Sequence, residues 1–322
     1  MTTSQVLENL RSREIISDQQ DTVIRSYLAE KPFSVHGELR LILYLGILFS
    51  GSGLGIIIYE NIDTIGHQAI FGGISIVTIL CFFYSYKFRS PFSWQKAESS
   101  NQFAEYTLLF GCTTFLILEG YLQFQYKFFG TKYGLAAFIP TVIFFFCAYR
   151  FDHKGVLSMA ITGLASWLGL TIAPFSIVSK NDFTDPKLII IAIILGVILT
   201  IINWLSDINN LKKHFAFTYI FLGGNLAVIA STTGLFTHDS KVVYFITGIA
   251  LSVFFIIYSR QKASLVFLLM GIVYGYINIT YILFELLPEL FNGSFQIYYF
   301  LFTSIGILLF LLNFKKILRI QK

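Results

Sequence analysis

Long apolar segments recur along the chain and are separated by short polar gaps. Ten of these segments are about 20 residues long, the length that an α-helix needs to cross the hydrocarbon core of a bilayer. The ten predicted spans are residues 41–59, 68–86, 103–123, 129–149, 155–176, 188–206, 215–235, 242–259, 263–286 and 295–313. The pattern therefore predicts an all-α fold, a polytopic transmembrane helical bundle.

The distribution of lysine and arginine supports this division of the chain. Eighteen of the 23 lie in the N-terminal segment, in the C-terminal tail and in every second gap between the apolar segments. Cytoplasmic loops of membrane proteins carry such an excess of positive residues, so both termini are predicted to be cytoplasmic. A missed or an extra span would disrupt the alternation, which therefore also supports ten spans.

Composition excludes a soluble domain and argues against a nucleic-acid partner. Hydrophobic residues make up 55% of the chain and charged residues 13%, and the mean hydropathy is +0.70. Soluble domains have about 25% charged residues, which this chain lacks. The net charge of +5 comes from residues that border the spans rather than from one basic face. We expect the lipid bilayer, and no nucleic acid, as a partner.

Three regions follow from this pattern. Residues 1–38 are predicted to form a cytoplasmic amphipathic helical hairpin, residues 39–314 a transmembrane domain, and residues 315–322 a basic cytoplasmic tail. Ser17 and Gln20 have the spacing of a capping box at the start of the second helix of the hairpin. The hairpin is too short to bury a core of its own, so it is expected to pack on the bundle, on lipid headgroups or on a protein partner.

The ninth span carries a polar stripe. Tyr274, Asn278, Tyr281 and Glu285 are spaced by four, three and four residues, which puts them on one helical face. Polar side chains inside a bilayer avoid lipid, so the stripe faces the bundle or a water-filled cavity. One interpretation is a solute path with Glu285 near its outer end. The alternative is hydrogen bonding between helices.

Two further spans carry candidate residues for such a path. Gly223, Gly224 and Asn225 lie near the middle of the seventh span, where a helix break would suit a transport site and close packing is the alternative. Glu119 lies near the predicted external end of the third span. An ionisable residue within a span suggests a function, although water at the membrane interface could equally satisfy this carboxylate.

The gaps between spans offer weaker candidates. Glu60, Asp63 and His67 are placed in the first external loop, where two carboxylates and an imidazole could perform acid–base chemistry or bind a metal. Their spacing matches no metal motif, and ordinary solvated loop residues are the alternative. Asp152 and His153 are expected to be solvated and paired locally with Arg150 and Lys154 in a tight cytoplasmic turn. No catalytic residue, metal or cofactor is predicted.

The N-terminal part of the chain resembles a known family. The resemblance lies in Leu10, Arg13, the segment Ile15-Ile16-Ser17-Asp18-Gln19-Gln20, Ile24, Tyr27, the glycine-rich segment 46–55 and Glu60-Asn61-Ile62-Asp63. These residues are similar to those of the bacterial membrane-protein family called domain of unknown function 2157. The resemblance covers about the first 150 residues. It implies a bacterial inner-membrane protein with a cytoplasmic N-terminal helical segment, and it implies no activity or catalytic residues.

These observations leave three hypotheses for the function. The first is a small-solute transporter-like protein with a polar path between spans seven and nine. Two sets of five spans would have inverted topology, but no matching motifs relate the two halves, so an inverted repeat is left open. The second is a non-catalytic envelope protein that binds a protein partner through residues 1–38. The third, ranked last, is a membrane enzyme that uses Glu60, Asp63 and His67.

Overall fold

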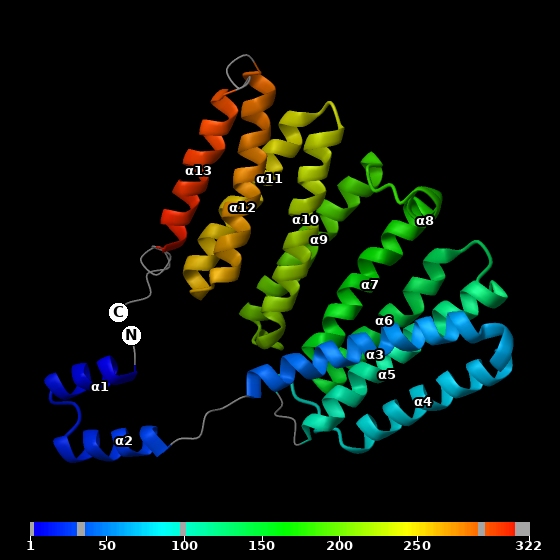
Figure 1. Ribbon diagram of the computed structural model, residues 1–322, viewed down its shortest axis with the longest axis horizontal. Helices are drawn as coiled ribbons and strands as arrows, with labels where there is room; N and C mark the ends of the chain where they lie inside the picture. Colours follow the sequence, from blue (N-terminus) through cyan, green and yellow to red (C-terminus); the bar gives the residue numbers. More distant parts are fainter. Residues whose placement is uncertain (1–2, 31–35, 97–100, 289–293, 313–322) are drawn as a thin grey trace.

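The computed structural model is a bundle of α-helices (Figure 1). It describes residues 3–30, 36–96, 101–288 and 294–312, and the described part contains helices and no strand. The predicted basic tail, residues 315–322, lies outside the described residues. The helices are α1 (Thr3–Ser12), α2 (Asp18–Glu30), α3 (His36–Ile65), α4 (His67–Lys87), α5 (Gln102–Tyr126), α6 (Tyr133–Phe151), α7 (Lys154–Ile172), α8 (Pro174–Lys180), α9 (Pro186–Ile208), α10 (Ala216–Thr237), α11 (Lys241–Lys262), α12 (Leu265–Leu286) and α13 (Ser294–Leu312), with a 3₁₀ turn η1 (Lys213–Phe215) before α10.

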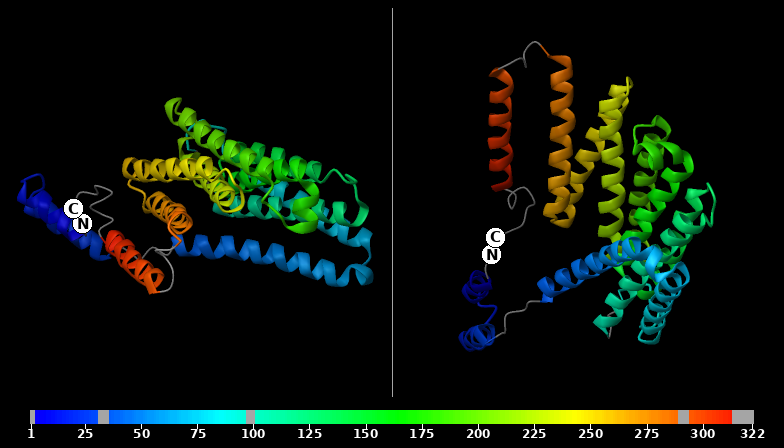
Figure 2. Two further views of the ribbon diagram at one scale, coloured as in Figure 1. Left: turned by 90° about the horizontal axis from the view of Figure 1, so that it is seen from above. Right: turned by 45° about the vertical axis from the view of Figure 1, so that its right-hand side comes forward.

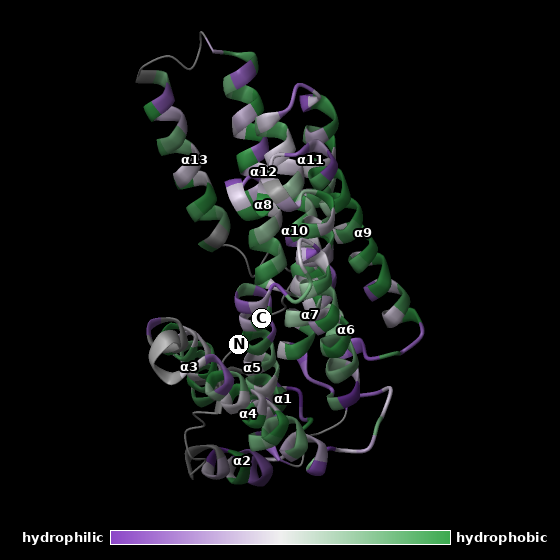
Figure 3. Ribbon diagram, turned by 90° about the vertical axis from the view of Figure 1, so that its right-hand side faces the viewer, coloured by the Kyte–Doolittle hydropathy of each residue, from purple (hydrophilic) through white to green (hydrophobic). Residues whose placement is uncertain are grey.

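The helices have the length and composition of membrane spans. Eight of the described helices are long and apolar enough to cross a bilayer. They coincide with the second to ninth predicted spans, and shorter apolar stretches at Leu41–Ile57 in α3 and Phe295–Phe310 in α13 coincide with the first and tenth. Large apolar side chains are exposed all along these helices, and Figure 3 shows apolar ribbon along the helices with polar residues towards their ends. The predicted all-α polytopic membrane fold is confirmed.

The long helices pair as consecutive hairpins. α4 packs on α5, α6 on α7, α9 on α10, and α11 on α12. Each pair has lysine or arginine at its turn. Arg89 and Lys212 lie in the connections themselves, and Arg150 and Arg260 lie in the last turns of α6 and α11. α3 packs on α4 and α5, whereas α13 lies beyond α12 at the edge of the bundle (Figure 2). Most contacts between helices are therefore made within a hairpin or between hairpins that are neighbours in the sequence. α3 and α13 lie at the periphery.

Two of the hairpins turn with the same backbone geometry. Asp152 (φ 58°, ψ 39°) and Ala263 (φ 49°, ψ 40°) end α6 and α11 in the left-handed conformation. Each is followed by an extended residue, His153 or Ser264, whose N–H donates to the carbonyl five residues back, in both cases at 3.0 Å. These bonds satisfy carbonyls that the end of a helix leaves without partners, so a two-residue turn suffices to reverse the chain.

α10 is the central helix, and it packs on α7, α9, α11 and α12. Small residues let α9 approach it closely. A Cβ added to Gly196 of α9 would lie 2.7 Å from Ala227 Cβ and 2.8 Å from Ala227 N, which leaves no room for a side chain. Small residues of this kind let helix backbones pack tightly in membranes, where no hydrophobic effect drives them together.

Two expected features of the chain differ in the structure. The fifth predicted span ends early, because Pro174 begins the short helix α8 after a bend at Ala173. A proline fits the first turn of a helix, where its missing N–H has no partner to lose. α3 continues to Ile65, well past the apolar segment that predicted it. Its last turns carry the residues that were expected in an external loop.

Two short helices, α1 and α2, precede α3, and a capping box begins the second of them. Ser17 N–H donates to Gln20 Oε1 at 2.9 Å, and Gln20 N–H donates to Ser17 Oγ at 3.3 Å, which is the predicted capping box. α1 packs on α2, and Leu7 and Asp21 are buried between them. Figure 1 shows this pair of helices beside the bundle rather than within it.

Candidate functional site

The predicted polar stripe of the ninth span connects α12 to α10. Tyr274 Oη donates to Asn225 Oδ1 at 2.8 Å, and Thr232 Oγ1 donates to Asn278 Oδ1 at 3.1 Å. Asn225 Nδ2 also donates to the carbonyl of Phe221 within α10, at 2.6 Å. Asn225 and Asn278 thus face each other's helices. Their contacts match the interpretation as hydrogen bonds between helices.

Asn278 is fully buried, with 0% of its surface exposed. Its Nδ2 has no hydrogen-bond partner among the described residues, and it faces Gly248 of α11. A Cβ added to Gly248 would lie 2.6 Å from this nitrogen, so the glycine makes room for the amide. The cavities described below are lined by other residues than Asn225 and Asn278.

The glycine pair of the seventh span packs tightly and does not break the helix. α10 runs without interruption from Ala216 to Thr237. A Cβ added to Gly223 would lie 2.7 Å from Leu199 Cβ, and one added to Gly224 would overlap the ring of Phe255. The close-packing alternative therefore describes these glycines, and the interpretation as a helix break does not.

The other two members of the stripe lie towards the end of α12. The ring of Tyr281 lies 4.5 Å from that of Phe236, centroid to centroid. Glu285 forms an ion pair with Lys241 at the start of α11, and both side chains are partly exposed. This pair stabilises the contact between α11 and α12 only modestly, because exposed ion pairs are screened by water.

The residues that were predicted to lie in the first external loop, Glu60, Asp63 and His67, lie in helices. Glu60 and Asp63 lie in the last turns of α3, and the side chain of Asp63 lies outside the described residues. His67 begins α4, and its two ring nitrogens lie 2.8 Å from Tyr121 Oη and 3.1 Å from Gln125 Nε2, both on α5. The imidazole thus bonds to α5. Within the described part of the chain, no group of three or more acidic, histidine or cysteine residues is placed to hold a metal ion.

Glu119 is the predicted site residue with the most unusual surroundings. It lies seven residues before the end of α5, so its Cα is about 10 Å along the helix axis from that end. It is 7% exposed, and its Oε1 has no hydrogen-bond partner among the described residues. A buried carboxylate without a partner costs free energy, so such a group is retained where it has a use.

The Glu119 side chain borders a cavity of about 590 Å³, which we call the Glu119 pocket. Its wall is mostly apolar, and its polar members are Glu119, Gln123, Lys127 and Tyr133. Gln123 holds the loop at the pocket, since its Nε2 donates to Gly130 O at 2.9 Å and its Oε1 accepts from Phe129 N–H at 3.0 Å. The remaining lining residues are Leu116, Gly120, Phe124, Ala136, Ala137, Leu170 and Val178.

A second cavity of about 440 Å³ lies between α7, α8, α9 and α10. Leu170 lines both cavities, so they adjoin across this residue. The lining of the second cavity is almost entirely apolar, with Ser166 and Thr233 as its hydroxyl groups. The Glu119 pocket therefore combines two charged side chains of opposite sign, the buried Glu119 and Lys127, with space for a small molecule. Asn225, Asn278 and Glu119 do not converge on one cavity.

A buried ion cluster at the opposite end of the helices was missed by sequence reasoning. Lys212 Nζ lies 2.9 Å from Asp152 Oδ1, and His214 Nε2 bonds to the same oxygen. Only 2% of the Lys212 side chain and 6% of the Asp152 side chain are exposed. Asp152 is thus paired across sixty residues of sequence, and the expectation that it is solvated and locally paired is wrong.

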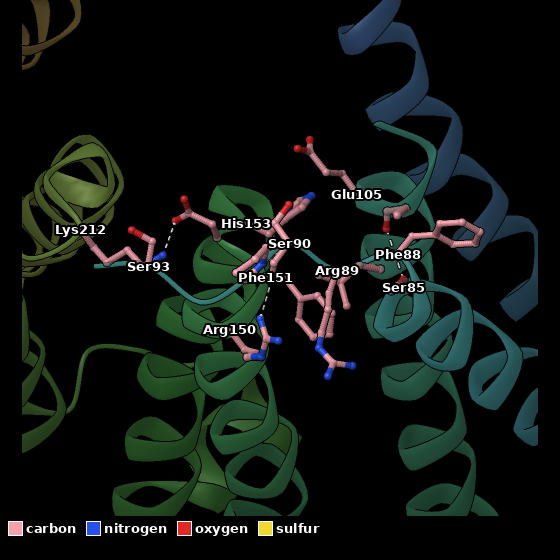
Figure 4. Close-up of a pocket in the computed structure, with 14 residues that line it drawn as sticks. Ser85, Phe88, Arg89, Ser90, Ser93, Glu105, Arg150, Phe151, His153 and Lys212 are labelled. Atoms are coloured by element: carbon pink, nitrogen blue, oxygen red, sulfur yellow. Dashed lines mark hydrogen bonds and ion pairs between the residues drawn. The ribbon is translucent and has the colours of Figure 1, made fainter. Parts of the chain in front are cut away.

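This ion cluster links three connections between helices, those of α4–α5, α6–α7 and α9–α10. Lys212 reaches from the connection between α9 and α10, and its N–H donates to Trp94 O of the α4–α5 connection at 2.8 Å. Its Nζ lies 5.4 Å from the Phe92 ring centroid, so the charge is shielded from water by aromatic side chains. Arg150 Nη1 donates to Ser90 O at 3.1 Å on the same side of the bundle (Figure 4).

A cavity of about 30 Å³, large enough for one or two water molecules, lies beside the cluster. It is lined by Asp152, His153 and Lys212, among others. The sequence did place Asp152, Lys212 and His214 in polar gaps between spans. Their pairing could not be inferred from this, because lysine in such a gap is already explained by the orientation of the protein in the membrane.

Comparison with known proteins identifies the N-terminal half. Residues 8–157 match a family model described as predicted membrane protein (DUF2157). The match extends from α1 to the start of α7, and it confirms the family that the N-terminal residues resemble. No curated protein and no solved structure matches the chain.

Proposed function

We propose that this membrane protein is transporter-like and takes a small cationic solute into the Glu119 pocket. The observation that carries the proposal is a buried carboxylate oxygen without a partner at the wall of a cavity of about 590 Å³. An ammonium group would supply the missing hydrogen bonds to Glu119. The apolar wall would receive the rest of the solute, as in most small-molecule sites.

The proposal replaces the path that the sequence placed between the seventh and ninth spans. The α10 and α12 side chains of that path bond to each other, and Glu119 lies on α5 beside α6 and α7. In this view Asn225, Tyr274 and Asn278 hold the two helices together. The solute contacts Glu119 and the pocket that adjoins it.

We expect Glu119→Gln to weaken solute binding while the fold persists. The amide keeps the shape of the side chain and removes the charge, so affinity for an ammonium ion should fall by roughly ten- to a hundredfold, the value of one charge-assisted hydrogen bond. Binding is measured by the thermal stabilisation of the purified protein in detergent by butylamine and propylamine, whose ammonium groups carry N–H donors, with butyrate as the anionic control. Uptake of the radiolabelled amine that stabilises most is then followed in proteoliposomes.

The matched control is Glu105→Gln, at the other end of the same helix. It should leave amine binding unchanged. Without ligand, Glu119→Gln should be as stable as the parent or more stable, because it removes a buried carboxylate that has no partner. Equal binding by the parent and by Glu119→Gln would overturn the proposal. If Glu119→Gln loses binding but the parent shows no uptake in proteoliposomes, the proposed function is limited to solute binding.

The orientation belongs to the same proposal. The four hairpin turns that carry Arg89, Arg150, Lys212 and Arg260 are the basic connections, so we place them and both termini in the cytoplasm of a bacterial cell, with the protein in the inner membrane. The Glu119 pocket then opens towards the external side.

Partner binding by residues 1–38 is a second candidate function. It is favoured by apolar side chains that α1, α2 and their connection leave exposed, namely Ile15, Val23 and Tyr27 at 62%, 66% and 68%. We expect Val23→Asp with Tyr27→Asp to abolish capture of a cytoplasmic protein by the immobilised full-length chain. Thr22→Asp, on the exposed surface of the same helix, should leave capture intact. Equal capture by both variants would contradict this function.

A further inference from the structure

A basic groove lies beside the ends of α4 and α6, on the side of the bundle with the ion cluster. It encloses about 670 Å³ and is lined by Lys87, Arg89 and Arg150, together with Phe83, Tyr86 and Ser90. None of the described residues that line it is acidic. Glu105 and Asp152 line the smaller cavity that Arg89 and Arg150 also border, but Asp152 is already paired with Lys212, so the groove itself keeps an excess of positive charge. Its charge therefore complements an anion.

The two guanidinium groups are held in place before any ligand arrives. Arg89 Nη1 donates to Tyr86 O at 3.0 Å, and its guanidinium carbon lies 3.4 Å from the centroid of the Tyr86 ring. Arg150 Nη1 donates to Ser90 O at 3.1 Å. Figure 4 marks the hydrogen bond between Arg150 and Ser90 with a dashed line. Such ordering lowers the entropy lost on binding, and the planar guanidinium matches phosphate oxygens.

We infer that the groove binds the phosphate group of an anionic membrane lipid. The apolar surface of α4 favours a lipid over free phosphate as the ligand of the groove. Ile76, Ile79, Leu80 and Phe83 are 60%, 65%, 59% and 65% exposed, and their spacing puts them on one face of α4 that leads away from the groove. An acyl chain of a lipid whose phosphate lies at Arg89 and Arg150 runs along this face.

The inference is independent of the Glu119 pocket, which lies towards the other end of the helices. A basic groove at the membrane surface attracts anionic lipids electrostatically. Lysine and arginine beside a span also orient the protein, so the test must separate a specific groove from the general excess of positive charge.

The test is native mass spectrometry of the full-length protein in detergent, titrated with phosphatidylglycerol or phosphatidylethanolamine of the same acyl chains. We expect Arg89→Gln with Arg150→Gln to weaken phosphatidylglycerol binding roughly 30-fold, or about fivefold for each cation removed. Phosphatidylethanolamine binding should change little. The matched control, Arg260→Gln with Lys262→Gln, removes two cations from another hairpin turn and should leave phosphatidylglycerol binding within twofold of the parent.

A milder variant keeps the test decisive if the double variant fails to fold. Lys87→Gln retains both arginines and should weaken phosphatidylglycerol binding about fivefold. Equal losses in the groove variant and in the Arg260/Lys262 control would show diffuse attraction and overturn the site. Unchanged binding in the groove variants would overturn it as well. Complete displacement of the lipid by millimolar inorganic phosphate would assign the groove to free phosphate instead.

Discussion

Replacing Asp152 with asparagine is expected to destabilise the protein by about 3 kcal/mol, because it leaves a buried lysine without its counter-ion. Lys212 is 2% exposed and is surrounded by the Phe92 and Phe215 rings, so the one or two water molecules that fit in the adjoining cavity replace the charge of the carboxylate only in small part. His214 loses the same partner. The free energy of unfolding is measured by titration with sodium dodecyl sulfate in mixed micelles.

The double variant Asp152→Asn, Lys212→Met separates charge from shape. Methionine keeps much of the apolar length of lysine and removes the charge, so no buried ion is left unpaired. We expect the double variant to be more stable than Asp152→Asn alone. Lys213 remains in the same turn, which preserves a positive charge on this side of the membrane. If the double variant were as unstable as the single one, the loss would come from the shape of the turn and not from the buried charge.

The sequence predicted the spans well because one physical quantity sets their length. A helix must be long enough to cross the bilayer, and the length of each apolar segment in the sequence gives the length of the span directly. The error at α3 has the same cause. Its apolar segment stops near Tyr59, but the helix continues to Ile65, because backbone hydrogen bonds do not end where the lipid-facing side chains do. Glu60 and Asp63 were therefore placed in a loop.

Contacts between helices were predicted only in part. Four-residue spacing showed that Tyr274 and Asn278 share a face, and the structure brings that face to Asn225 and Thr232 of α10. Spacing describes one helix at a time, so it does not give the partner helix. The same limit hid the pair of Asp152 and Lys212, which belong to turns of different hairpins.

The surroundings of Glu119 required the packed structure. The sequence identified a carboxylate within a span, but a cavity arises from the way several helices leave space between them. Glycines pose a related problem. Adjacent glycines such as Gly223 and Gly224 can mark a helix break. In the structure Leu199 and Phe255 pack directly against them, so these glycines allow close packing of helices. No property of the seventh span alone distinguishes these outcomes.

Close packing of α9 on α10 gives the other large expected effect. Gly196→Ala should lower the free energy of unfolding by about 2 kcal/mol, as overpacking a tight interface does. The added Cβ would meet the Gly223 carbonyl oxygen and would lie 2.8 Å from the Ala227 backbone nitrogen. These are backbone atoms of a continuous helix and cannot rotate away, so α9 and α10 must separate.

Gly73→Ala is the matched control, because it adds the same methyl group in the interior of another span. A Cβ added to Gly73 has nothing within 4 Å, so only helix propensity changes, and the variant should be up to about 1 kcal/mol more stable than the parent. Gly224→Ala should fall between the two, since its Cβ meets the Phe255 ring, a side chain that can shift. The order is measured by sodium dodecyl sulfate unfolding of the three variants. Equal stabilities for Gly196→Ala and Gly73→Ala would contradict the close approach of α9 and α10, because only that approach makes the two glycines different.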